Sequence, residues 1–333
     1  MTYRAMVCRT LGTPDVLAME TREDVSLGRD EVRIAIAAAG VNFPDLLMVA
    51  GGYQFKPPLP FVPGMESAGV VLETGADVSR WRAGDRVIAR QRTGAFAERA
   101  VVPAESLWPL PAALSFEEGA SFFVGFSTAW NALVTRAALR KGERVLITGA
   151  AGGVGLAAVT LAVHLGAEVI AAASSAEKRE AARRAGAAHV IDSNADDFHE
   201  QVKSATGGHG ADVIYDPVGM TPLTLVRSAA FAARILIIGF TGGTIPDWPA
   251  NRVLLKCISL IGVRAGEWSR QFPHVRGEET DALLQRAEVG ELKPHVTRRF
   301  ALADAAQALH ALADRKAIGR MVITTGLADE RPA

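Results

Sequence analysis

A glycine-rich stretch, LITGAAGGVGLAA (residues 146–158), joins an apolar run to a run with helical spacing. Gly149, Gly152 and Gly155 follow the spacing G-x-x-G-x-x-G, and Gly153 adds one more residue without a side chain. A sharp turn from strand to helix needs backbone angles that glycine tolerates, and bare backbone lets a pyrophosphate reach the helix N-terminus. Tight packing alone also selects glycines, but the strand before, the helix after and the further strand–helix units favour dinucleotide binding.

The residues after the next apolar strand indicate which dinucleotide is bound. An enzyme that uses NAD has an acidic residue there, about 20 residues beyond the glycine loop, which binds the ribose hydroxyls. This sequence has Ser174 and Ser175 instead, and Lys178 follows one turn later. Hydroxyl groups, a helix N-terminus and an ammonium group suit a 2′-phosphate, so the sequence predicts NADPH rather than NADH. Glu177 is interpreted as the partner of Ser174 in a capping box.

The stretch PGMESAGVV (residues 63–71) places one carboxylate, that of Glu66, among apolar and small residues. An unpaired carboxylate is costly in such surroundings. We therefore expect Glu66 to pair with an arginine or with backbone N–H groups, and Arg86 and Arg264 are candidate partners.

Histidine and cysteine, the residues that hold zinc most often, are sparse. Residues 1–163 contain no histidine, and Cys8 and Cys257 are the only cysteines. A structural zinc site needs about four clustered ligands, and thioether or amide groups bind Zn²⁺ poorly, so we expect no metal. Both cysteines lie in apolar runs and are expected to be buried free thiols in a reducing compartment.

The elements that position these residues differ along the chain. Residues 1–110 contain short strand-like runs separated by Gly and Pro, which predicts a compact, mostly β domain. Ser115 and Glu118 form a candidate capping box before a helical stretch that Gly125 is expected to interrupt. Between residues 144 and 263 apolar strands alternate with helices, which predicts a doubly wound parallel sheet of about six strands.

After Val263 the pattern loosens. Two helical runs bracket the strand-like HVTRRF (residues 295–300), and a last apolar run follows at RMVITT. We expect this tail to fold back onto the first segment. The predicted domains are therefore a β-rich domain of residues 1–123 and 264–333, and a dinucleotide-binding domain of residues 124–263.

The composition argues against several partners. Lys plus Arg and Asp plus Glu each number 36 in 333 residues, and no basic block is present, so neither nucleic acid nor an anionic membrane is an expected partner. The most apolar stretch, residues 155–173, is interrupted by His164, Gly166 and Glu168 and does not read as a membrane span. The N-terminus has no long apolar core typical of a signal peptide. We expect a cytoplasmic protein.

The assembled motifs resemble the medium-chain dehydrogenase/reductase superfamily, and within it the zinc-independent quinone oxidoreductase (zeta-crystallin-like) family. The resemblance spans nearly the whole chain and is carried by VNFPDLLMVAGGY, LPFVPGMESAGVV, GDRV, GAFAERAVVP, STAWNAL, GAAGGVG and YDPVG, in that order. It implies an α/β architecture with a GroES-like β-rich catalytic domain, a Rossmann domain and an active site in the cleft between them. It also implies a homodimer that pairs the last Rossmann strand, within CISLIGV (residues 257–263), edge to edge.

The resemblance also implies roles for single residues, none of them a catalytic acid. Asn42, Asp45 and Tyr53 match positions that line the substrate cleft. Leu47 stands where some relatives have an aromatic residue in the substrate pocket, and Ser193 where many have a tyrosine near the adenine phosphate. The expected cofactor contacts are Asn42, Thr128, Gly152, Gly153, Val154, Ser174, Ser175, Lys178, Ser193, Gly239, Phe240, Thr241 and Arg320, with Arg320 on the adenosine phosphate side.

The stretch around Glu66 gains a meaning from the same resemblance. In zinc-containing relatives a histidine precedes the equivalent glutamate, and Met65 stands at that histidine position. Glu66 itself matches the glutamate that lies behind the metal. The resemblance therefore also implies an enzyme that works without zinc.

Without a Lewis acid, hydride transfer is easiest to an acceptor that delocalises the added electrons, and the protein has mainly to orient it. The predicted function is therefore the NADPH-dependent reduction of quinones, with electrons delivered as hydride or singly and a proton available from water. Two alternatives stay open. One is reduction of the double bond of enoyl thioesters or 2-alkenals, and the other is a non-catalytic NADPH-binding protein with a structural or RNA-binding role.

Overall fold

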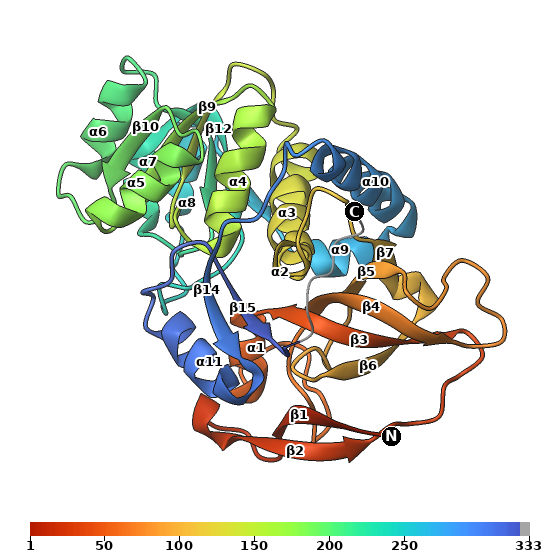
Figure 1. Cartoon of the computed structure of the whole chain (residues 1–333). Coiled ribbons are helices and arrows are strands. Elements are labelled where there is room, and N and C mark those ends of the chain that lie inside the picture. The colour runs from red at the N-terminus through yellow and green to blue at the C-terminus, as the bar shows by residue number, and fades with distance from the viewer. Residues whose placement is uncertain (327–333) are drawn as a thin grey trace. The chain divides into compact units, whose positions relative to one another are not determined.

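The computed structural model describes residues 1–326, which form two compact units (Figure 1). Unit 1 contains Met1–Val124 and the described residues from Ala287 onward, and unit 2 contains Gly125–Arg286. Unit 2 is therefore continuous in sequence, whereas unit 1 is assembled from both sides of it.

Unit 2 is built on a six-stranded parallel sheet. Its strands are β8 (Arg144–Ile147), β9 (Glu168–Ala173), β10 (His189–Asp192), β11 (Ala211–Asp216), β12 (Ala229–Ile237) and β13 (Ser259–Gly262). Their order across the sheet is β10-β9-β8-β11-β12-β13, which is the Rossmann order. This arrangement confirms the doubly wound parallel sheet that the sequence predicts.

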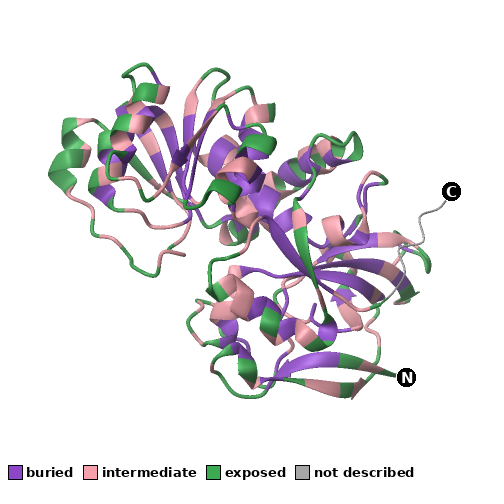
Figure 2. Ribbon diagram, turned by 60° about the vertical axis from the view of Figure 1, so that its left-hand side comes forward, coloured by how far each residue is buried: buried purple, intermediate pink, exposed green. Residues whose placement is uncertain are grey.

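Helices connect these strands and cover the sheet. They are α4 (Gly153–His164), α5 (Ala176–Arg184), α6 (Phe198–Ala205), α7 (Pro222–Ser228) and α8 (Ala250–Leu255). The middle strands are apolar and buried, as Figure 2 shows, because a parallel sheet carries helices on both faces. Helix α3 (Phe122–Trp130) and the π-helical turn η3 (Asn131–Arg136) precede β8.

The end of unit 2 differs from the expected boundary. Helices α9 (Ala265–Gln271) and α10 (Pro273–Glu288) follow β13, and the chain up to Arg286 belongs to unit 2 rather than to the β-rich part. One physical link is visible: the Arg136 guanidinium lies 4.6 Å from the centre of a Trp268 ring, which holds α9 against η3.

Unit 1 is mostly β-structure, as expected. Its strands are β1 (Thr2–Cys8), β2 (Leu17–Glu23), β3 (Glu31–Gly40), β4 (Glu66–Thr74), β5 (Arg86–Arg90), β6 (Arg99–Pro103), β7 (Leu107–Pro109), β14 (Val296–Ala301) and β15 (Arg320–Thr324). β1 and β2 form a hairpin-like pair, and the others form one sheet in the order β14-β15-β3-β4-β5-β7, with β6 also paired to β3. β15 runs antiparallel to β3, so the tail does return to the first segment.

The helices of unit 1 are short: α1 (Phe43–Val49), α2 (Phe116–Gly119) and α11 (Ala305–Ala313), with 3-10 turns η1 (Pro14–Val16), η2 (Ala104–Ser106) and η4 (Leu302–Asp304). The predicted capping box is confirmed, because the Ser115 side chain accepts from the Glu118 N–H at 3.2 Å and the Glu118 carboxylate accepts from the Ser115 N–H at 2.8 Å. The helical stretch is interrupted between α2 and α3, however, and not at Gly125.

The two cysteines have different surroundings. Cys8 is buried as expected, but Cys257 is exposed, which corrects the expectation for it. Cys257 has a positive φ of 53° just before the sheet's edge strand β13. Within residues 1–326, no helix combines the length and apolar character needed to cross a membrane.

Candidate functional site

The glycine loop of unit 2 links β8 to α4 at the carboxyl edge of the sheet. Gly149 has a φ of 54°, in the left-handed region that favours glycine. A Cβ atom on Gly155 would lie 2.3 Å from the Gly149 carbonyl oxygen. The turn itself therefore requires glycine at both positions.

Gly152 differs from these two glycines, because a side chain at this position would not collide with the protein. A Cβ atom on it would meet only the Gly149 carbonyl oxygen, at 3.4 Å, so the protein does not fill the space beside it. Gly152 is also the N-cap of α4. It has no side chain that could accept a hydrogen bond from the N–H groups of the first turn, which includes Gly153 and Val154. Uncapped N–H groups at the end of a long helix, next to open space, fit a dinucleotide pyrophosphate.

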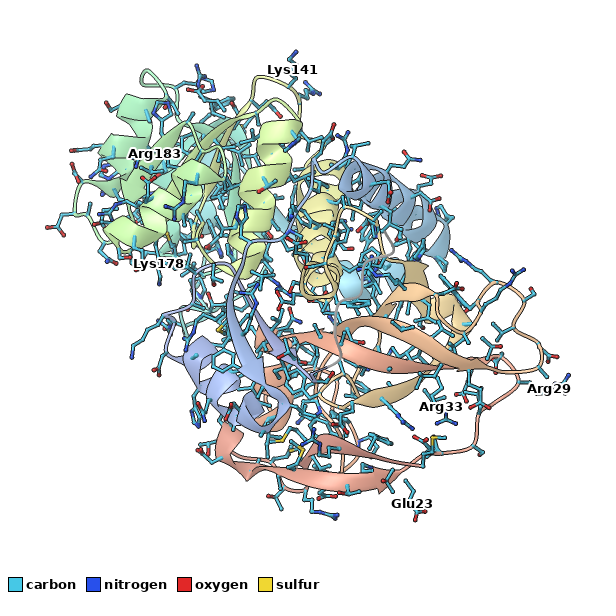
Figure 3. The ribbon with its side chains drawn as sticks, in the orientation of Figure 1. Glu23, Arg29, Arg33, Lys141, Lys178 and Arg183 are labelled. Atoms are coloured by element: carbon cyan, nitrogen blue, oxygen red, sulfur yellow. The ribbon has the colours of Figure 1, made fainter. Side chains whose placement is uncertain are left out.

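The carboxyl ends of β9 and β10 bring the next predicted residues together. Ser175 caps α5, and its Oγ accepts the Lys178 N–H at 3.3 Å. The Ser174 carbonyl accepts from Asn194 Nδ2 at 3.4 Å, and Ser193, beside Asn194, follows β10. Figure 3 shows Lys178 at the end of unit 2 opposite Lys141, which precedes β8. Three hydroxyls, a helix N-terminus and a lysine therefore lie at one edge.

The cap of α5 differs from the expectation, and the structure adds an ion pair that was not predicted. The capping pair is Ser175 with Lys178 rather than Ser174 with Glu177, and Glu177 is exposed in the first turn of α5. The nearby Asp192 carboxylate forms an ion pair with Arg179 at 2.8 Å. This pairing joins a helix to the neighbouring strand, so local sequence reasoning missed it, and it neutralises an acid beside the predicted phosphate site.

The loop after β12 carries Gly239, Phe240 and Thr241, and it is fastened to the loop after β11. The Thr241 N–H and Oγ1 both donate to the Pro217 carbonyl, at 3.1 and 3.0 Å, and the Gly242 N–H donates to the Val218 carbonyl at 2.8 Å. Both loops leave the same edge of the sheet as the glycine loop, because the strands are parallel.

Thr128 lies on α3, which packs against α4. A Cβ atom on Gly125 would lie 3.3 Å from the Ala157 Cβ, so the two helices approach closely there. Thr128 is three residues after Gly125 and hence on the same helix face. All the predicted cofactor residues of unit 2 thus lie on the carboxyl edge of its sheet or on the helix that packs against α4.

In unit 1, Asn42 precedes α1 and is 3 % exposed. Its Nδ2 donates to the Gly40 carbonyl at 3.3 Å and to Glu66 Oε1 at 3.1 Å. Since both neighbours are acceptors, the amide has only one favourable orientation. Its Oδ1 is then a buried acceptor with no partner among the described residues, which fits a hydroxyl donor from a ligand.

Asp45 lies in the first turn of α1 and is fully buried. Its Oδ2 accepts the Asn42 N–H at 2.9 Å. The pKa of the Asp45 carboxyl is raised to about 7, chiefly by burial and also by the charge of Glu66, against the lowering effect of the Asn42 N–H. Asp45 is therefore a buried carboxyl that changes charge near neutral pH.

Glu66 is fully buried and has three partners within unit 1. Its Oε2 accepts the Val124 N–H at 2.9 Å, and its Oε1 accepts from Asn42 and from the guanidinium of Arg320, whose side chain is 6 % exposed. Glu66 was expected to pair with an arginine or with backbone N–H groups, and the structure shows one partner of each kind. The candidates were wrong, since the Arg86 guanidinium lies over the Phe116 ring and Arg264 is near Glu267 in unit 2.

The same ion pair engages Arg320, which the resemblance assigns to the adenosine phosphate side of the cofactor. A guanidinium that is buried and paired with Glu66 has little surface for an adenosine phosphate. Arg320 supports the Asn42 and Glu66 group, and its role at the cofactor stays a prediction. Met65, the residue before Glu66, packs against the apolar core of unit 1. Among residues 1–326 no cluster of three or more His, Cys, Asp or Glu side chains is arranged to hold a metal ion.

Tyr53 lines a pocket of about 180 Å³ that lies entirely within unit 1. The pocket has aromatic, thioether and aliphatic walls and one ammonium group; its lining includes Leu11, Met48, Tyr53, Phe55, Lys56 and Leu59. Such a lining suits a flat or aliphatic group better than a polar one. Leu47 does not line this pocket.

Known proteins match both units. Residues 28–112 match the family model "Alcohol dehydrogenase GroES-like domain" and residues 153–278 match "Zinc-binding dehydrogenase". The quinone oxidoreductase-like protein 2 homolog of Nematostella vectensis is 38% identical over 327 residues, which cover 97% of this chain and 89% of that protein.

Solved structures match equally widely. A mycobacterial protein complexed with NADPH has a TM-score of 0.89 and 30% identity, covering 97% of this chain and 100% of its own. The quinone oxidoreductase of Pseudomonas syringae pv. Tomato DC3000 has a TM-score of 0.87 and 30% identity, with coverage of 97% and 100%.

Proposed function

Because the chain belongs to the zinc-independent quinone oxidoreductase family of the medium-chain dehydrogenase/reductase superfamily, we propose that this oxidoreductase uses NADPH to reduce quinones or related conjugated carbonyl compounds. The observation that carries the proposal is the glycine loop. Gly152 leaves open space at the uncapped N-terminus of α4, where a pyrophosphate finds backbone N–H donors without displacing a side chain.

The choice of NADPH rests on the end of β9. Ser174, Ser175 and Lys178 offer hydroxyl and ammonium groups to a 2′-phosphate, and the neighbouring Asp192 is neutralised by Arg179. A carboxylate that binds the ribose hydroxyls of NAD would repel that phosphate. The mycobacterial relative complexed with NADPH supports the same choice.

NADPH supplies a hydride when it is bound, and the residues of this chain hold and orient it. In this proposal Thr128 binds the carboxamide, and Gly239, Phe240 and Thr241 line the cofactor beyond β12. Asn42 uses its Oδ1, which has no hydrogen-bond partner among the described residues, to accept a hydrogen bond from a ribose hydroxyl. Glu66 and Gly40 fix the other end of that amide, so the acceptor atom is oriented before the ligand arrives.

The acceptor is placed by the residues of unit 1. We assign the apolar pocket at Tyr53 to the acceptor or to its apolar substituent, since its volume of about 180 Å³ holds a small ring or a short chain. A quinone or a conjugated enone carries the added electrons on its own carbonyl oxygen, so it needs orientation more than a strong acid.

Steady-state oxidation of NADPH tests the function directly. We expect turnover with 1,4-benzoquinone, and slower turnover with crotonyl-CoA and a 2-alkenal. Turnover with the thioester alone would replace the quinone assignment by enoyl-thioester reduction. An absence of NADPH oxidation with every acceptor, while NADPH still binds, would favour the non-catalytic alternative.

We also propose a homodimer formed through β13. Within residues 1–326 this strand pairs only with β12 and leaves its other edge open. Leu260 on β13 is 37% exposed, and Leu254 and Leu255 on α8 are 76% and 67% exposed. An open strand edge beside exposed apolar side chains supports pairing with a second copy.

A further inference from the structure

Asp216, the last residue of β11, is a buried carboxylate to which no role has yet been given. It is 4% exposed, and its strand lies between β8 and β12 in the sheet. Within the described part of the chain it forms no ion pair with a lysine, arginine or histidine. A buried charge without a cation must be stabilised by hydrogen bonds.

Four neutral donors surround this carboxylate. Its Oδ1 accepts from Thr148 Oγ1 at 2.5 Å, from the Val218 N–H at 3.1 Å and from the Gly219 N–H at 3.2 Å. Its Oδ2 accepts from the Met220 N–H at 3.0 Å. Three consecutive backbone N–H groups thus point at one side chain, and they wrap the loop after β11 around it.

The loop after β11 contacts both the loop after β12 and the glycine loop after β8. Its Pro217 and Val218 carbonyls receive the hydrogen bonds from Thr241 and Gly242 described above. A Cβ atom on Gly149 would lie 2.9 Å from Val218 Cγ2, so the loop also packs on the glycine loop. Thr148, which donates to the carboxylate, immediately precedes Gly149.

We propose that Asp216 is a positioning residue: its ionised carboxylate holds the loop of residues 217–220, and this loop sets the positions of Thr241 and of the glycine loop for the dinucleotide. The inference rests on the proposed function, because the dinucleotide is the ligand that those two loops are proposed to bind. Asp216 acts through backbone groups and does not itself contact the dinucleotide. Burial raises the pKa of Asp216, and the four donors oppose that effect because they favour the charged form.

The test compares substitutions that preserve shape. Asp216→Asn puts an N–H₂ group against at least one backbone N–H, so a donor faces a donor. We expect the Kd for NADPH, measured by nicotinamide fluorescence on the full chain, to rise about tenfold or more. Thr148→Val removes one donor and should raise the Kd less. Thr148→Ser keeps the hydroxyl, so its Kd for NADPH should equal that of the wild type.

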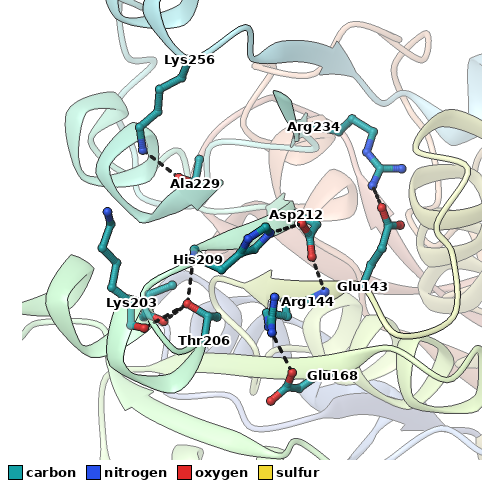
Figure 4. A network of polar contacts seen from close by, with 12 residues as sticks. Glu143, Arg144, Glu168, Lys203, Thr206, His209, Asp212, Ala229, Arg234 and Lys256 are labelled. Atoms are coloured by element: carbon teal, nitrogen blue, oxygen red, sulfur yellow. Dashed lines mark hydrogen bonds and ion pairs between the residues drawn. The ribbon is translucent and has the colours of Figure 1, made fainter. Parts of the chain in front are cut away.

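Asp212, at the opposite end of β11, provides the matched control. Its carboxylate accepts a hydrogen bond from the Arg144 N–H at 2.8 Å and forms another with His209 Nε2 at 2.7 Å, as Figure 4 shows. Asp212→Asn should lower the Tm without changing the Kd for NADPH. If both variants raise the Kd in proportion to their loss of Tm, or if Asp216→Asn binds NADPH like the wild type, the inference is wrong.

Amide hydrogen exchange separates this inference from the proposed function. Asp216→Asn should speed exchange at the N–H groups of residues 218–220 and of Thr241 and Gly242, whereas Asp212→Asn should not. A wild-type protein that fails to bind NADPH would refute the proposed cofactor. The exchange rates would still show whether Asp216 fixes these loops, and unchanged rates would refute that role.

Discussion

Glu66 and Arg320 are 254 residues apart in sequence and form a buried ion pair beside the end of β3. Gly40, the last residue of that strand, leaves room for the pair, because a Cβ atom there would lie 2.8 Å from Glu66 Oε1 and 2.3 Å from the Ala120 carbonyl oxygen. The pair and the Val124 N–H fix the carboxylate to which the Asn42 amide donates.

Removing one member of this pair leaves the other charge buried. We expect Arg320→Met to lower the free energy of unfolding by about 3–5 kcal/mol, and the double variant Glu66→Gln/Arg320→Met to recover part of that loss. Urea unfolding measures both. Arg299→Met is the control, since Arg299 pairs with Glu117 at 2.6 Å but is 57% exposed, and its loss should cost under about 1 kcal/mol.

A different result would support the cofactor role predicted for Arg320. If Arg320→Met keeps the wild-type stability but weakens NADPH binding, the arginine binds the cofactor after all. Equal stability losses for Arg320→Met and Arg299→Met would mean that burial adds nothing to the pair.

Asp45 should make stability depend on pH in the direction opposite to that of most carboxylates. The unfolded carboxyl titrates near 3.8 and the folded one near 7. The folded protein therefore binds the extra proton between these values, so the free energy of unfolding falls as the pH rises from about 4 and levels off above about 7.

Asp45→Asn removes this titration while it keeps an acceptor for the Asn42 N–H. We expect the variant to be more stable than the wild type at pH 8, by on the order of a few kcal/mol, and the difference to shrink toward pH 4. The pH profiles are compared from urea unfolding of the two proteins between pH 4 and pH 8. Parallel pH profiles for wild type and Asp45→Asn would contradict the assignment.

Lys178 should distinguish the two cofactors. Removal of one ammonium–phosphate contact by Lys178→Ala should raise the Kd for NADPH about tenfold and leave the Kd for NADH nearly unchanged, because NADH lacks the 2′-phosphate. Lys141→Ala, at the opposite end of unit 2, should change neither. Equal losses for both cofactors after Lys178→Ala would rule out a 2′-phosphate site there.

Tyr53 is expected to act through its ring. Tyr53→Phe keeps the pocket wall, so KM for 1,4-benzoquinone should stay within about twofold of the wild type, whereas Tyr53→Ala should raise it about tenfold. Steady-state kinetics at saturating NADPH gives both values. A large rise in KM for Tyr53→Phe would instead assign the acceptor contact to the hydroxyl.

Leu260 should report on the proposed dimer. Leu260→Glu places a charge on the open edge of the sheet, and we expect the variant to be monomeric by light scattering at concentrations where the wild type is dimeric. Leu72→Glu, at a residue on β4 with a similar exposure of 41%, is the control and should not change the mass. A wild type that is monomeric at all concentrations would refute the dimer.

Local patterns in the sequence were sufficient for most of the fold. The short strand-like runs of residues 1–110 correspond to strands of unit 1, and the apolar strands from Arg144 onward match the parallel sheet. The glycine loop could be located from its spacing together with the strand before it and the helix after it, because its geometry depends on residues close to one another in sequence. These features need no knowledge of distant contacts.

The features that could not be predicted depend on contacts between residues far apart in sequence, or on whether a strand lies at the edge of its sheet. The partner of Glu66 is set by β15 returning to β3, so no local signal distinguishes Arg320 from Arg86. Cys257 lies in an apolar run that is as hydrophobic as a core strand but borders the sheet edge, and hydrophobicity alone does not separate these cases. The role of Asp216 requires knowing which loops meet beyond the ends of β8, β11 and β12.

The pairing of β15 with β3 also fixes an order of events during synthesis. Unit 2 is one uninterrupted segment and can complete its sheet as soon as Arg286 has left the ribosome. Unit 1 begins first but cannot finish, because Glu66 has no cation until Arg320 is made. The nascent chain must therefore carry an incomplete β-sheet and an unpaired carboxylate through the whole synthesis of unit 2, so unit 2 is expected to complete its fold before unit 1.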